Sequence, residues 1–224
     1  MGAVVLLSGG LDSTANLAMA LERGVRLEAL TVDYGQRAAS AEIQAAEKFC
    51  SYYDVPHEVL ALKWLGALGG SALTDVKISP PEVEPEELDD LQKTQETARA
   101  VWVPNRNGVL IQVAAAMAEA RGFQQVLVGF NREEAVTFPD NSAAFMDKAN
   151  AALAYSTANH VEVTSFTSQM DKTEIAKNLL KLPKPFPFHW VASCYLAAHE
   201  PCGRCESCRR FFRAMESAGV QTWK

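Results

Sequence analysis

The residues of this chain that could do chemistry begin with a short segment near its start, Ser8 to Ser13, which reads Ser-Gly-Gly-Leu-Asp-Ser. The apolar run before it, Ala3 to Leu7, predicts a buried parallel strand, and the apolar spacing from Leu11 to Glu22 predicts a helix. A strand that ends in small residues at the first turn of a helix presents backbone N–H groups and the positive end of the helix dipole. The segment therefore predicts a cradle for phosphate groups. It is not of the Walker type, because no lysine follows the glycines, and an ordinary glycine-rich turn is the alternative.

The second group of chemically active residues lies near the end of the chain, where four cysteines follow one another at short spacing: Cys194, Cys202, Cys205 and Cys208. Four thiolates at this spacing fit tetrahedral zinc and would fill its coordination shell. We therefore expect a structural metal that holds the end of the chain in place. An iron–sulfur cluster is the main alternative, because it also binds four thiolates, and disulfides are a further one.

The elements that must position these groups alternate between strand-like and helix-like segments. We predict strands at residues 3–7, 26–32, 57–62, 125–129 and 161–164, and helices at 11–22, 39–52, 109–120, 143–155 and 172–180. This order predicts an α/β fold with a doubly wound parallel sheet, in which the carboxyl ends of the strands share one edge. We place a nucleotide-binding domain at residues 1–185 and a small zinc-binding segment at 186–224.

Residues 77–97 interrupt this alternation with three prolines and a cluster of acidic side chains. A solvated surface loop is the simpler interpretation. A mobile lid over the site is the alternative, because long loops near a site often close over it.

Composition limits the class of protein. The chain has 224 residues, of which 48% are hydrophobic and 21% charged, and its net charge of −6 argues against a broad nucleic-acid or anionic membrane surface. The first apolar run lacks a basic leader, and no apolar stretch approaches the roughly 20 residues that span a bilayer. We therefore expect a cytoplasmic protein with no direct nucleic-acid or membrane partner.

The first segment resembles the signature of the PP-loop ATP pyrophosphatases, which hold the β,γ-diphosphate of ATP and release AMP and pyrophosphate. Six motifs in order resemble the 7-cyano-7-deazaguanine synthases of the queuosine pathway, over about residues 3–210: residues 8–14 (SGGLDST), 33–37 (DYGQR), 104–107 (PNRN), 138–140 (FPD), 171–175 (DKTEI) and the four cysteines. The resemblance implies an adenine nucleotide α-hydrolase-like fold. It also implies ATP-dependent conversion of 7-carboxy-7-deazaguanine and ammonia to the nitrile through an amide, with one structural zinc and a homodimer.

The chain departs from the family pattern at three places. Ala38 stands where a histidine is common, Asn105 where a glycine is common, and Asn141-Ser142 where many members have Cys-Arg. Asn105 is compatible with the glycine position because asparagine also accepts a positive φ. The change at Asn141 lies in a segment that we expect to line the substrate pocket.

The chemistry assigns roles to particular residues. A carboxylate does not react with ammonia until its oxygen is made a good leaving group, which adenylation achieves. We expect the ATP phosphates to be held by the residues of the first segment: Leu7, Ser8, Gly9, Gly10, Leu11, Asp12, Ser13 and Thr14. Asp12 is the best candidate ligand for Mg²⁺. Arg37, Arg106 and Lys172 are, with Asp12, the candidate catalytic residues, because their cations suit phosphate or the substrate carboxylate. A solvated surface charge is the simpler interpretation of each cation.

The candidate substrate-binding residues are Tyr34, Gln36, Phe130, Glu133, Phe138 and Asp140. The Asp140 carboxylate could accept from a guanine-like edge, with Glu133 and Glu134 as weaker candidates for that role. Alternatively, Asp140 caps the helix that begins at Ala143. Phe130 and Phe138 could stack on a purine ring or belong to the core.

Two other functions stay open at this point. The chain could be another PP-loop adenylating enzyme that acts on tRNA or on a protein, or a non-catalytic, zinc-bearing nucleotide sensor. The acidic composition offers no evident surface for RNA, and cations placed near a leaving diphosphate would serve no purpose in a sensor.

Overall fold

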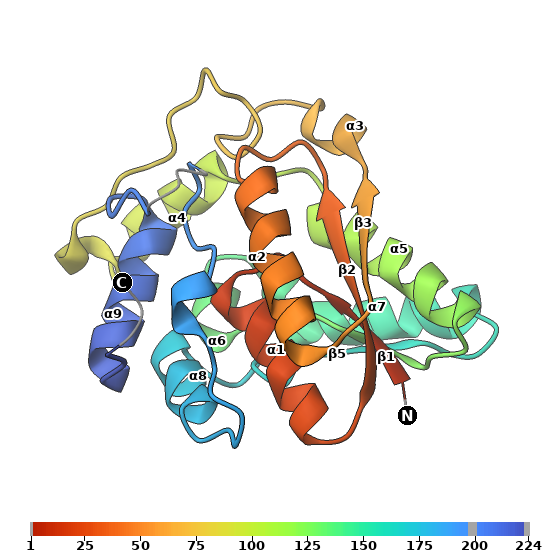
Figure 1. Ribbon diagram of the computed structural model, residues 1–224. Coiled ribbons are helices and arrows are strands. Elements are labelled where there is room, and N and C mark those ends of the chain that lie inside the picture. Colours follow the sequence, from red (N-terminus) through yellow and green to blue (C-terminus); the bar gives the residue numbers. More distant parts are fainter. Residues whose placement is uncertain (1, 197–200, 222–224) are drawn as a thin grey trace.

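Five short strands of the described chain form one parallel sheet with helices on both of its faces (Figure 1). The computed structural model describes residues 2–196 and 201–221. The strands are β1 (Gly2–Leu6), β2 (Arg26–Asp33), β3 (His57–Ala61), β4 (Gln125–Leu127) and β5 (Glu162–Thr164). Their order is β3-β2-β1-β4-β5, so the chain leaves β1 in one direction and later returns to its other side. This confirms the predicted doubly wound sheet, whose reversal next to β1 is where such folds bind ligands.

Nine α-helices are described: α1 (Leu11–Glu22), α2 (Ala39–Tyr53), α3 (Lys63–Gly66), α4 (Leu91–Ala100), α5 (Arg106–Ala120), α6 (Arg132–Ala135), α7 (Ala143–Ser156), α8 (Lys172–Leu179) and α9 (Glu206–Ala218). One-turn 3-10 helices occur at Pro85–Glu87, Pro139–Asn141 and Phe188–Trp190. The predicted elements are all present, with ends shifted by at most three residues. None of the described helices combines the length and the apolar character that crossing a bilayer requires.

The alternation of side chains along β1 divides the core between the two faces of the sheet. Val4 packs in a cluster with Ile111 of α5 and Leu153 of α7. Val5 faces the other way and packs in a cluster with Leu17 of α1 and Ala46 of α2. Because both faces are covered, the central strand β1 is apolar and buried, as is usual for parallel sheets, whereas β3 at the edge of the sheet is partly exposed.

Residues 77–97 are not the solvated loop that we expected. Val83 and Leu88 are buried, with exposed fractions of 3% and 2%. The backbone of Glu82 forms an antiparallel bridge with Cys205, and α4 begins at Leu91 after the Asp90 carboxylate accepts from Lys93 N at 3.0 Å. The segment is thus held against the C-terminal part of the chain, whose Arg209 and Arg210 donate to the Val83 and Leu88 carbonyls.

The C-terminal helix α9 joins the core of the rest of the chain. Phe211 and Met215 of α9 pack in one cluster with Leu11 of α1 and Ile175 of α8. The two segments predicted from the sequence therefore share a core, and their division after residue 185 stays a prediction.

Candidate active site

The phosphate-cradle segment lies where β1 ends and α1 begins. Gly9 has φ +75°, and a Cβ there would lie 2.6 Å from the Ala45 side chain, so this turn requires glycine. Gly10 is the N-cap of α1, and no described side chain caps this end of the helix. The loop is braced from within by Ser13 Oγ, which accepts from Ser8 N at 3.3 Å and donates to Gly10 O at 3.1 Å. The first N–H groups of α1 are thus left for an anion rather than for the protein.

A second glycine brings the end of β4 against this cradle. A Cβ on Gly129 would lie 2.7 Å from Ser13 N, a contact with backbone that cannot move aside cheaply. Glycine at this position therefore lets the loop after β4, including Phe130, approach the first turn of α1.

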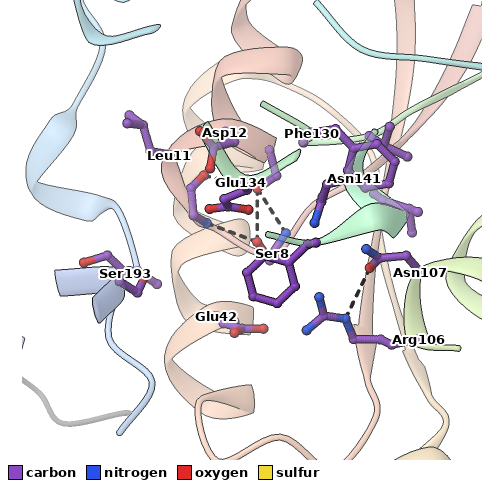
Figure 2. A pocket seen from close by; sticks show the side chains of 18 of the residues that line it. Ser8, Leu11, Asp12, Glu42, Arg106, Asn107, Phe130, Glu134, Asn141 and Ser193 are labelled. Carbon is purple, nitrogen blue, oxygen red and sulfur yellow. Dashed lines mark hydrogen bonds between the residues drawn. The ribbon is translucent and has the colours of Figure 1, made fainter. Parts of the chain in front are cut away.

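A cavity of about 290 Å³ opens at the carboxyl edge of the sheet (Figure 2). The loops after β1, β2 and β4 form one side of it, and α5, α8, residues 192–195 and the first turns of α9 form much of the rest. Twelve of the predicted site residues line the cavity: Leu7, Ser8, Gly10, Leu11, Asp12, Ser13, Tyr34, Arg106, Phe130, Phe138, Lys172 and Cys194. Thr14 lies behind the cradle, where its hydroxyl donates to Gly10 O at 2.7 Å.

Four of the predicted catalytic and substrate-binding residues lie outside the wall of this cavity. Arg37 donates from Nη1 to the Ile78 carbonyl at 3.1 Å, which occupies its guanidinium in the loop that follows β3. Gln36 braces its own turn, because it accepts from Tyr34 N at 2.9 Å and donates to Val32 O at 3.1 Å. The carboxylate of Glu133 binds arginines of α9.

Asp140 is the fourth of these residues. Its interpretation as the cap of α7 is wrong, because Ser142 is the N-cap and accepts from Phe145 N at 3.1 Å. Burial raises the pKa of Asp140, and the nearby Arg106 cation limits that rise.

The charged centre of the cavity wall is Lys172, which begins α8 after a capping box formed by Asp171 and Glu174. Its Nζ lies 2.5 Å from Asp12 Oδ2 and 2.8 Å from Glu134 Oε1, and its side chain is only 8% exposed. Burial works against the ammonium, but these two carboxylates outweigh it and raise the pKa of Lys172. The lysine is therefore held as a cation beside the phosphate cradle.

Asp12 has one oxygen committed to Lys172 and one without a partner. Burial raises the pKa of the Asp12 carboxyl from 3.8 to about 6, with Lys172 acting in the opposite direction. The other oxygen, Oδ1, is buried and has no hydrogen-bond partner in the part of the chain that the structure describes. Because an unpartnered buried oxygen is costly, this atom is suited to a ligand such as a cation.

The opposite end of the cavity carries the second cation. Arg106 donates from Nε to Asn107 Oδ1 at 3.2 Å (Figure 2). Its Nη1 donates to Tyr34 Oη at 3.4 Å. It begins α5 directly after Asn105, whose φ of +50° confirms that asparagine takes the left-handed conformation there. Asn141 also points into this region and is only 6% exposed. A cation and a polar amide thus face the space that the cradle leaves open.

The four C-terminal cysteines converge behind the cavity wall. Their Sγ atoms all lie within 4.8 Å of one another, and Cys202 and Cys208 Sγ are 3.9 Å apart. A tetrahedral zinc with bonds of 2.3 Å separates its sulfurs by about 3.8 Å, so the spacing fits a four-thiolate metal site. Backbone N–H groups of Leu196 and Cys202 each donate to Cys194 Sγ at 3.4 Å, which favours thiolates over thiols. All five cysteines are free, so the disulfide alternative finds no support.

Comparison with known proteins decides the family. The model described as Queuosine biosynthesis protein QueC matches residues 2–219. The chain belongs to this family. It is 48% identical over 221 residues to the 7-cyano-7-deazaguanine synthase of Pelotomaculum thermopropionicum, with 99% of each chain covered. It is 49% identical over 219 residues to that of Desulforudis audaxviator, with 98% of each covered. For the synthase of Desulforamulus reducens the identity is 47% over 220 residues, covering 98% of this chain and 96% of that one.

Sequence reasoning missed several residues of this QueC-family site. Glu134 was only a minor alternative to Asp140, yet it holds Lys172. Asn107 and Arg210 line the cavity and were not candidates. The signal that was available for Asn107 is its place in the PNRN motif beside Arg106. No local pattern distinguishes Arg210, because its pair with Glu206 is an ordinary i,i+4 helix pair and its other partners, Glu133 and the Leu88 carbonyl, lie in distant parts of the chain.

Proposed function

We propose that this QueC-family protein converts 7-carboxy-7-deazaguanine and ammonia to 7-cyano-7-deazaguanine, with ATP split into AMP and pyrophosphate. The observation that carries the proposal is the uncapped first turn of α1, which opens beside the buried Lys172 on a cavity whose far side holds Arg106 and two phenylalanines. The names of the relatives support the substrate class, and the cavity geometry supports the proposed role of each group.

The phosphate end of the site would use the cradle and Lys172. The N–H groups of α1, with the hydroxyls of Ser8 and Ser13, would donate to the diphosphate, and the Lys172 ammonium would stabilise the charge that develops on the leaving pyrophosphate. The free oxygen of Asp12, together with Glu134, fits the hard, oxygen-ligated Mg²⁺ ion. When bound, Mg²⁺ would neutralise phosphate charge.

The substrate end would use Arg106, Asn141 and the aromatic wall. The Arg106 guanidinium is suited to orient the substrate carboxylate toward the α-phosphorus, and Phe130 and Phe138 offer faces for the planar ring. The Asn141 amide can accept from and donate to the lactam edge of a guanine-like base. The buried cavity would keep water from the acyl adenylate.

The reaction balances in two activations. A carboxylate oxygen attacks the α-phosphorus and pyrophosphate leaves; ammonia then attacks the carbonyl carbon, and AMP and a proton leave to give the amide. In the second, the amide oxygen attacks the α-phosphorus of a second ATP and pyrophosphate leaves; loss of AMP and the two N–H protons then gives the nitrile. No covalent enzyme intermediate is required, in agreement with a wall that presents cations and amides to the substrate.

The remaining expectations of the sequence analysis belong to this proposal. The four cysteines would hold one structural zinc, whose filled shell leaves no position for substrate. The cytoplasmic location rests on the composition of the chain, and the homodimer rests on the resemblance alone. Four predicted residues would act only indirectly. Other groups of the protein bind three of them, Arg37, Gln36 and Glu133, and the fourth, Asp140, lies outside the cavity wall.

The test is incubation of the purified protein with ATP, Mg²⁺, ammonium and 7-carboxy-7-deazaguanine. The nitrile and AMP should appear together, with the amide as a transient. AMP formed only with a different acceptor would indicate another adenylating enzyme. Absence of AMP under every condition would favour a nucleotide sensor and refute the proposal.

A further inference from the structure

The acidic segment and the C-terminal helix are joined by a series of ion pairs. We call residues 82–89 the acidic strap, which lies beside α9 (Figure 1). Glu82 pairs with Arg204 at 3.1 Å, and Asp89 Oδ2 pairs with Arg213 at 2.8 Å. These pairs are largely exposed and contribute little individually, but they place the strap against the start of α9.

Arg210 is the buried member of this arrangement. Its side chain is 9% exposed, and its Nη2 binds both Glu206 Oε1 and the Leu88 carbonyl of the strap at 2.9 Å. Its Nη1 binds Glu133 Oε1, an oxygen that also accepts from Arg213 Nη2 at 2.6 Å. Two guanidinium groups of α9 thus converge on one carboxylate of α6.

Helix α6 has only four residues, so its position depends on its contacts with other elements. Arg132 anchors its first residue to Asp171 and Glu174 at 3.1 and 2.9 Å, through a side chain that is 54% exposed. Glu133 anchors it to α9 through a side chain that is 17% exposed. The next residue, Glu134, reaches Lys172 at 2.8 Å. The more buried of the two anchors is therefore the one adjacent to the residue that holds the lysine.

We infer that Arg210 is a positioning residue for the reaction: through Glu133 it fixes α6, and through Glu134 it sets where the Lys172 ammonium stands beside the phosphate cradle. The inference rests on the proposed function for the role of Lys172. It gives the four-cysteine segment and the acidic strap a second role besides stability, because both hold the helix that carries Arg210.

The test compares Arg210→Met and Glu133→Gln with the matched control Arg209→Met. Arg209 lies on the same helix and contacts the strap at Val83 O and Glu84, at 3.3 and 3.5 Å, but it does not contact α6. We expect R210M and E133Q to lower kcat by about tenfold to a hundredfold, the range for a displaced reacting group. KM for ATP should stay within about threefold, since the cradle itself is unchanged. R209M should keep the kcat of the parent, and the double variant R210M/E133Q should be no worse than either single variant.

Hydrogen exchange of the peptide spanning residues 130–137, in the protein without nucleotide, supplies a readout that does not depend on activity. Exchange should rise in R210M and E133Q but not in R209M. If the parent protein forms no AMP with any acceptor, the proposed function fails and this exchange experiment still decides the inference about α6. If R210M does not fold with its metal, E133Q carries the test. Equal kcat losses in R209M and the other two variants, or unchanged exchange in E133Q, would overturn the inference.

Discussion

Replacing Lys172 by methionine tests the charged centre of the site most directly. Methionine fills a similar volume but leaves the carboxylates of Asp12 and Glu134, which are 12% and 31% exposed, without their cation. Removing one partner of a buried ion pair costs about 3–5 kcal/mol of unfolding free energy. Because both carboxylates face a cavity rather than closely packed core, we expect the lower end, about 3 kcal/mol, at alkaline pH.

The loss of unfolding free energy in K172M should depend on pH. Burial raises the pKa of Asp12 to about 6 in the parent, and Lys172 opposes that rise, so its removal raises the pKa further. A carboxyl whose folded-state pKa lies above its unfolded value binds protons more tightly when folded, and stability falls as the pH rises toward the folded pKa. Above about pH 6 the parent ionises Asp12 beside a cation, whereas the variant must keep the proton or bury an unpaired charge. The difference between the two proteins therefore grows with pH.

The measurement is urea unfolding of the metal-loaded proteins at about pH 5 and about pH 8.5, on either side of the Asp12 transition. Lys177→Met is the matched control, because Lys177 is an exposed lysine of the same helix. It should change stability by less than about 0.5 kcal/mol at both pH values. A K172M penalty that is equal at the two pH values, or larger at the acidic one, would refute the reasoning.

Three further substitutions test other parts of the site. Gly129→Ala places a Cβ 2.7 Å from Ser13 N and should displace the cradle. The rate of pyrophosphate release should then fall at least about tenfold. An unchanged rate would mean that the close approach is not needed. Cys205→Ala should lose metal and stability together, because metal binding also holds the C-terminal segment; a fully stable variant with full metal content would contradict the structural role. Under the proposed function, Asn141→Leu should raise KM for the deazapurine acid about tenfold or more while KM for ATP is unchanged, since the amide proposed to pair with the substrate is lost. A parallel rise in both KM values would point to general damage instead.

The fold was predictable because its elements carry strong local periodicity. The turn between β1 and α1 requires glycine at position 9, and the Ser-Gly-Gly sequence indicated such a turn. The strap was not predictable in the same way. Its buried residues, Val83 and Leu88, are isolated apolar positions among acids, and the side chains that bind their carbonyls come from α9, more than a hundred residues later.

The site was predicted in part for a similar reason. Lys172 and Arg106 begin helices at the sheet edge, so their positions followed from the topology. Arg37 also follows a strand, but its guanidinium turns to the Ile78 carbonyl, a choice set by a loop whose path the sequence does not specify. The different partners of Glu133 and Glu134 have the same cause. The Glu133 carboxylate binds Arg210 and Arg213, about eighty residues later, whereas the Glu134 carboxylate binds Lys172.

The placement of Ser193, Cys194 and Tyr195 in the cavity wall has a consequence for how the protein matures. A chain still emerging from the ribosome would already contain the phosphate-cradle segment, residues 8–13. It would lack the part of the cavity wall that residues 193–195 form. We therefore expect a chain that stops before Ser193 to form no AMP from ATP. Turnover would begin only once this part of the wall is present and the cysteines lie close together.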